Sequence, residues 1–145
     1  MRNEVKTIND KCEMINHDEA PQDLTTRTRQ FALRIIRLFG NLKPQDVAGQ
    51  VIGKQLLRSG TSVGAQYCEA SRARSRAEFV SKLESSLQEL EETRYWLALL
   101  AEAEIVPEAR LLPLQTEARE LTAIFVASAR TAKSSIEKRR PRKLP

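Results

Sequence analysis

The middle of the sequence carries hydroxyl, carboxylate, amide and guanidinium groups at spacings that could support chemistry. The residues are Gln55, Arg58, Ser62, Glu69, Ser86, Glu89 and Glu92. A serine nucleophile needs a neighbouring base, but the single histidine is His17, and no lysine pairs with a serine in a familiar motif. Carboxylates inside a helical bundle can hold two metal ions, but that arrangement uses Glu-x-x-His motifs, which this sequence lacks. We therefore predict a protein that is not an enzyme, with no cofactor and no metal site.

The spacing of these polar residues predicts a structural role. Each residue of a helix advances about 100° around the axis, which places Gln55, Arg58, Ser62 and Glu69 on one strip. We expect this strip to meet the serine and the two glutamates of the following helix in a polar seam. Such a seam fixes the register of two helices more than it adds stability, because buried charges need partners.

Glycines form a second strip on the same helix, roughly opposite the polar one. Gly49, Gly53, Gly60 and Gly64 follow one another along it. Helical glycine costs roughly 0.5–1 kcal/mol relative to alanine, so a compensating close contact is expected. Small residues let two helices approach closely. The partner is either a helix of the same bundle or another subunit; a phosphate-binding loop is disfavoured because the Walker pattern is absent.

Three large apolar side chains lie partly off the main apolar stripe of the next helix. They are Tyr95, Trp96 and Leu99. These side chains belong either to a wide core or to a subunit contact, where aromatic residues are favoured.

Periodicity and capping signals predict the helices that position these groups. We expect helices over 23–40 and 44–72, a third from the capping box of Ser75 and Glu78 to near residue 104, and a fourth after Pro107. Pro113 indicates either a separate turn before it or a helix that begins there. The prediction is an all-α, antiparallel up-and-down four-helix bundle over 23–135, with a flexible tail over 1–22 and a disordered basic tail over 136–145.

Charge is distributed unevenly along the 145 residues, whose formal net charge is +5. Residues 24–72 carry eight basic and two acidic residues, and residues 130–145 carry seven and one. Two clusters could neutralise phosphates without reading sequence. The residues are Arg72, Arg74 and Arg76 in one, and Lys138, Arg139, Arg140, Arg142 and Lys143 in the other. The alternative is a solvated surface that serves solubility alone.

Several short motifs resemble the four-helix-bundle proteins encoded within intervening sequences of 23S ribosomal RNA genes. The matching stretches are QLLRSGTSVGAQYCEA at 55–70, SRAEF at 75–79 and SSLQELEE at 85–92. Gln66 stands where that family usually has asparagine, and Ala70 where it usually has glycine. Gly60 and Gly64 are not part of the common pattern. The resemblance covers about residues 24–135 and implies a four-helix bundle that forms a homopentamer. Proteins of one distant branch of that family partner a reverse transcriptase and bind nucleic acid.

Two functions follow as hypotheses. The first is a homo-oligomer, a pentamer by resemblance, that binds RNA or DNA through basic surface; five copies at +5 would carry 5 × 5 = +25. The second is an oligomeric adaptor that binds a protein partner and has no nucleic-acid role. No apolar run is long enough to span a bilayer and no secretory signal is visible, so we expect a cytoplasmic protein with no membrane partner.

Overall fold

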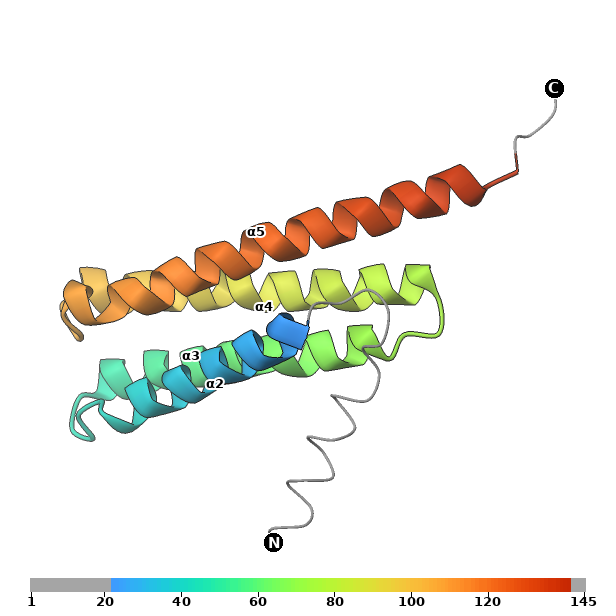
Figure 1. Cartoon of the computed structure of the whole chain (residues 1–145). Coiled ribbons are helices and arrows are strands. Elements are labelled where there is room, and N and C mark those ends of the chain that lie inside the picture. Colours follow the sequence, from blue (N-terminus) through green and yellow to red (C-terminus); the bar gives the residue numbers. More distant parts are fainter. Residues whose placement is uncertain (1–21, 142–145) are drawn as a thin grey trace, which may run out of the picture.

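Four consecutive helices, each antiparallel to the one before it, account for nearly all of the chain that the computed structural model describes, residues 22–141 (Figure 1). They are α2 (Gln22–Gly40), α3 (Val47–Ser71), α4 (Arg76–Glu102) and α5 (Glu108–Arg139). The predicted all-α, antiparallel up-and-down four-helix bundle is confirmed. The predicted tail over 1–22 lies almost wholly outside the described residues, as do Arg142 and Lys143.

Capping side chains set where α3 and α4 begin. α3 starts at Val47 and not at residue 44, because the Asp46 carboxylate accepts a hydrogen bond from the Gly49 N–H at 2.9 Å. α4 starts after Ser75, whose hydroxyl accepts from the Glu78 N–H at 3.1 Å. The Glu78 carboxylate in turn accepts from the N–H of Arg74, one residue before the expected partner.

α5 differs from both predictions for the region around Pro113. The helix is continuous from Glu108, with the proline inside it, so there is neither a separate turn nor a late start. The helix also runs to Arg139, beyond the predicted end near Ser135. Lys138 and Arg139 are therefore helical residues of its last turn, where positive charge interacts favourably with the helix dipole.

Apolar side chains from all four helices fill the core. Leu56 and Val63 of α3 are fully buried, as are Leu90 and Leu97 of α4. The Tyr67 ring of α3 stacks on Phe125 of α5, with ring centroids 5.4 Å apart. The helical stripes identified from the sequence therefore converge on one interior, which is what a bundle of amphipathic helices requires.

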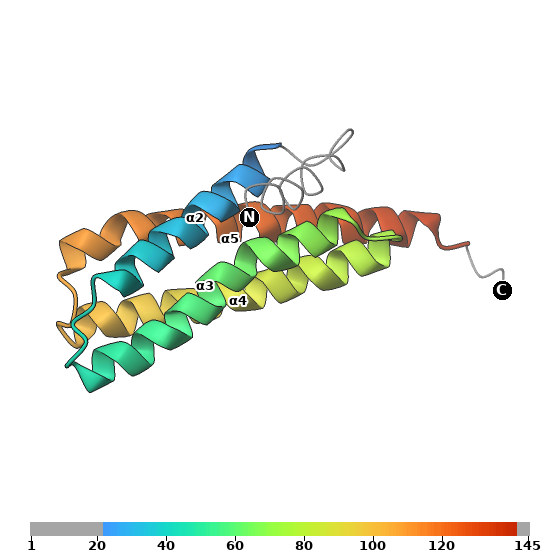
Figure 2. The ribbon, with the colours of Figure 1, turned by 90° about the horizontal axis from the view of Figure 1, so that it is seen from below.

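α2 is the shortest of the four helices, and the view from below shows it running alongside α3 and obliquely to α5 (Figure 2). Near its N-terminal end, the Arg27 guanidinium donates to both carboxylate oxygens of Glu117 at 3.0 Å and to Glu120 at 2.9 Å. This ion pair joins α2 to α5.

No helix among residues 22–141 is both long and apolar enough to cross a membrane. The same residues contain no group of three or more histidine, cysteine, aspartate or glutamate side chains placed to hold a metal ion.

Candidate nucleic-acid interface

The glycine strip of α3 lies against α2 of the same chain. A Cβ placed on Gly53 would lie 2.4 Å from Leu42 Cδ1, and one on Gly60 would lie 2.9 Å from Ile35 Cγ1. A Cβ on Gly64 would lie 3.2 Å from the hydroxyl of Thr28 on α2. Of the two alternatives left open by the sequence, these glycines thus form the close crossing within the bundle.

Gly49 lies at the start of the strip but has different neighbours. A Cβ there would lie 2.9 Å from the Asp46 carboxylate and 3.2 Å from Ile105 Cγ2. This glycine therefore makes room for the helix cap and for the α4–α5 connection, and it does not contribute to the crossing with α2.

The predicted polar seam is centred on Arg58 of α3. Its guanidinium donates to the Glu92 carboxylate of α4 and lies 3.5 Å from Glu89. The Trp96 indole N–H donates to the same Glu92 oxygen at 3.2 Å. Hydrogen bonds from Arg58 and then Trp96 lower the pKa of Glu92 below its ordinary value.

Other members of the predicted seam are divided between different contacts. Glu69 pairs with Lys82 of α4 at 2.8 Å and not with Arg58. The Ser62 hydroxyl donates to the Arg58 carbonyl of its own helix at 2.7 Å. Gln55 is exposed and makes no hydrogen bond with the described residues. The polar seam between α3 and α4 therefore contains fewer residues than the sequence predicted.

Buried hydroxyls form the innermost layer between α3 and α4. The Ser86 hydroxyl donates to the Val63 carbonyl across the interface at 2.8 Å. The Thr93 and Ser59 hydroxyls are hydrogen-bonded at 2.9 Å, and both residues are fully buried. Sequence reasoning missed the Ser59–Thr93 pair, although a threonine seven residues after Ser86 in an apolar stripe was a usable signal.

These polar groups hold two helices in register and show no catalytic geometry. The hydroxyls of Ser59, Ser86 and Thr93 each interact with a carbonyl or another hydroxyl, and none of the three has a histidine or lysine partner able to take its proton. The seam therefore acts structurally, by satisfying polar groups that would be costly to bury alone.

Exposed apolar side chains lie on the outer surface of α3 and α4. Val47 is 76% exposed, Val51 58% and Tyr95 57%. Trp96 and Leu99 are half-buried, and the Trp96 ring meets Tyr95 edge-on with centroids 5.0 Å apart. We call Val47, Val51, Tyr95, Trp96 and Leu99 the apolar α3–α4 surface.

The two predicted basic clusters lie at the same end of the bundle. An ion pair between Glu84 of α4 and Lys133 of α5 fixes the register of these antiparallel helices. Arg76 precedes Glu84 by eight residues, and Arg140 follows Lys133 by seven, so both reach the same level along the bundle. Both views show the α3–α4 turn and the end of α5 together at this end (Figures 1 and 2).

We call this group the basic end. It consists of six exposed residues within the described part of the chain: Arg72, Arg74, Arg76, Lys138, Arg139 and Arg140. Two exposed carboxylates, Glu78 and Glu137, lie among them, and Glu78 is already engaged by the backbone N–H of Arg74. Positive charge is therefore in excess at this end, on two elements that are far apart in the sequence.

Four antiparallel helices without a strand among the described residues define the all-α four-helix-bundle class, and comparison with known proteins gives the family. The chain belongs to the family of 23S rRNA-intervening sequence proteins, whose model matches residues 22–127. The resemblance noted from the sequence motifs is thus confirmed.

A solved structure from Bacteroides thetaiotaomicron is similar to this chain. It is described as a protein with unknown function from the S23 ribosomal protein family. The two are 35% identical, with a TM-score of 0.68, over 72% of this chain and 96% of that one. No curated protein matches the chain. Neither the family nor this neighbour indicates an enzymatic activity.

Proposed function

We propose that the protein is a non-enzymatic homo-oligomer that binds nucleic acid through its basic end. One observation carries the nucleic-acid part: two basic clusters, about sixty residues apart in the sequence, are exposed side by side at one end of the bundle. Cations gathered on one surface attract the phosphate backbone and release its counterions, which gives affinity that depends on salt.

The contacts available at the basic end favour binding without sequence preference. Arginine and lysine side chains contact phosphates, whereas base recognition needs side chains that reach base edges or aromatic rings that stack. Phe79, three residues after Arg76, is half-buried and packs against the core, and Tyr67 and Phe125 are fully buried. RNA and DNA of any sequence should therefore bind similarly at this end.

A mobility-shift titration with matched charge variants tests this proposal. The test variant replaces Arg74, Arg76 and Arg140 by alanine, and the control replaces Arg37, Lys43 and Lys54, which are equally exposed and lie toward the opposite end. The test variant should weaken binding and reduce the salt slope by about 2 for a single strand, since each lost phosphate contact removes about 0.7. Equal binding by both variants would refute a role for the basic end.

Self-association is proposed on the apolar α3–α4 surface. Single exposed apolar residues are common, but this group gathers two valines, a tyrosine and a half-buried tryptophan on one side of the bundle. Aromatic residues are enriched in protein–protein contacts. A pentamer is the state that the family resemblance implies, and light scattering at micromolar concentration measures it directly. A monomeric mass would exclude an oligomer of any order.

The alternative is an oligomeric adaptor whose partner is another protein, and the same apolar surface is the observation that favours it. Capture from a nuclease-treated lysate separates the two functions. A protein retained after nuclease treatment, together with no shift of RNA or DNA at low salt, would support the adaptor and contradict the nucleic-acid proposal.

A further inference from the structure

A groove runs along the outer side of α4 and α5 and leads toward the basic end. Its first part has a volume of about 510 Å³ and is lined by residues of both helices, including Arg94, Gln115 and Arg119. Its second part, of about 420 Å³, is lined by residues closer to the end of α5, including Val126, Arg130 and Lys133. Both parts lie between the same two helices, so they follow one surface.

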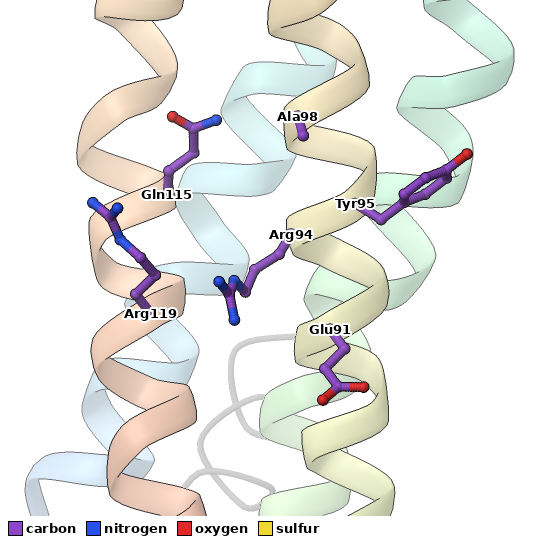
Figure 3. A pocket seen from close by; sticks show the side chains of 6 residues that line it. All are labelled: Glu91, Arg94, Tyr95, Ala98, Gln115 and Arg119. Carbon is purple, nitrogen blue, oxygen red and sulfur yellow. The ribbon is translucent and has the colours of Figure 1, made fainter.

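Cations are repeated along this groove. Arg119 and Arg130 are eleven residues apart, which is about three helical turns, so they project from the same side of α5. In Figure 3 the Arg94 side chain extends from α4 toward α5, whereas Tyr95 points the other way, toward α3. The cations of the groove therefore come from both of its walls.

The three arginines of the groove lack carboxylate partners among the described residues. Arg94 and Arg130 make no ion pair with the described residues, and Arg119 donates only to the Thr116 hydroxyl at 3.2 Å. By contrast, Lys133 is paired with Glu84. Glu91 and Glu137 also line the groove, but neither forms an ion pair with these arginines. Three exposed guanidinium groups are thus free to bind an external anion.

We propose that the α4–α5 groove binds the backbone of a single-stranded nucleic acid that enters at the basic end. This inference rests on the proposed function and extends its site along the molecule. From Arg130 to Arg119 is eleven residues, or about 16 Å of helix, so one strand can contact both guanidinium groups along one side of α5. Hollows of about 510 and 420 Å³ have room for part of the backbone of one strand but are too small to hold a duplex.

The test measures binding of a fluorescent single strand of about 16 nucleotides, the upper range of single-strand sites, by anisotropy over a salt series. The groove variant carries Arg94→Ala and Arg119→Ala, both at exposed positions. The control carries Arg29→Ala and Arg37→Ala, two exposed arginines of α2 with the same change in net charge. Circular dichroism and light scattering verify that both variants keep the helicity and mass of the unaltered protein.

The groove variant should bind more weakly than the control, with a salt slope reduced by about 1.4 for two lost phosphate contacts. Binding of a duplex of equal length should be the same for both variants. If the groove variant equals the control while the basic-end variant loses affinity, the groove inference fails and the proposed function stands. If the duplex loses as much affinity as the single strand, the single-strand assignment is overturned. If the unaltered protein binds neither the single strand nor the duplex, the proposed function itself fails.

Discussion

At the scale of single residues, α3 approaches α2 closely because the facing positions of α3 are glycines, which have no side chain. The space that a Cβ on Gly60 would occupy is taken by Ile35, which is fully buried. Leu56 and Val63 of α3 pack into the core. The glycines therefore give up helix propensity so that neighbouring side chains can pack directly on the backbone of α3, and dispersion contacts along the crossing offset part of that cost.

Gly60→Leu should destabilise the bundle by about 1–3 kcal/mol, because a larger side chain in a packed interface forces neighbours out of their rotamers. Gly40→Leu is the matched control, since a Cβ at Gly40 has no neighbour within 4 Å. Urea unfolding followed by circular dichroism measures both variants. Equal midpoints for the two would show that the close crossing does not exist in solution.

Glu92 should make stability depend on pH. Its pKa is lowered from an ordinary value of 4.5 by Arg58 and Trp96, so the folded state holds the carboxylate in its charged form. A lowered pKa in the folded state stabilises the protein above 4.5, and this contribution is lost as the pH falls through the folded-state value. The contribution is small because the group is close to solvent.

Glu92→Gln should therefore be less stable than the unaltered protein at pH 7, with the difference shrinking toward pH 3. Glu91→Gln serves as the control, because Glu91 is exposed and has no ion pair among the described residues. Thermal melts at several pH values measure the effect. A gap between Glu92→Gln and the unaltered protein that does not change with pH would contradict the proposed linkage.

At the scale of helices, caps and prolines determine where each element begins and ends. The Ser75 hydroxyl satisfies an N–H that would otherwise be unpaired at the start of α4. Asp46 does the same for α3. These two short side chains set the lengths of both helices, and therefore the level at which the basic end begins.

Ser75→Ala should cost about 1 kcal/mol of stability through loss of the N-cap. Ser81→Ala, at an exposed position inside α4, should be nearly neutral because alanine favours a helix interior. Chemical unfolding compares the two variants. A larger loss from Ser81→Ala than from Ser75→Ala would be inconsistent with the cap.

The number, order and approximate limits of the helices could be predicted from sequence because periodicity and caps are local signals. The sequence could not predict whether Pro113 lies inside a helix, because its effect depends on how firmly the neighbouring residues are buried in the core. Leu111 and Leu114 beside it are anchored in the core, while Pro113 itself is exposed, so the helix tolerates one lost hydrogen bond. The extension of α5 to Arg139 was missed because a polar, basic sequence carries no apolar period.

At the scale of the whole molecule, sequence spacing could not show which surfaces meet. The Arg58 seam was predicted in outline because both strips lie at helical spacing. The ion pair of Arg27 with Glu117 was not, because nothing local connects residues ninety positions apart. The meeting of the two basic clusters likewise depends on the register between α4 and α5, which the sequence leaves open.

Val51→Asp should break the proposed oligomer into smaller species without unfolding the bundle, because it places a charge on the apolar α3–α4 surface at a site 58% exposed. Val126→Asp is the control, at an exposed apolar position of α5. Light scattering gives the mass and circular dichroism the fold. An unchanged mass for Val51→Asp would place the subunit contact elsewhere.

Binding of a single-stranded oligonucleotide across a salt series tests the central claim most directly. The account predicts measurable binding at low salt and a logarithm of the association constant that falls linearly with the logarithm of salt concentration, because phosphate contacts release counterions. Poly-pyrimidine and mixed sequences should give the same slope, since the basic end offers no base readout. Absence of binding at low salt, or an affinity that does not change with salt, would contradict it.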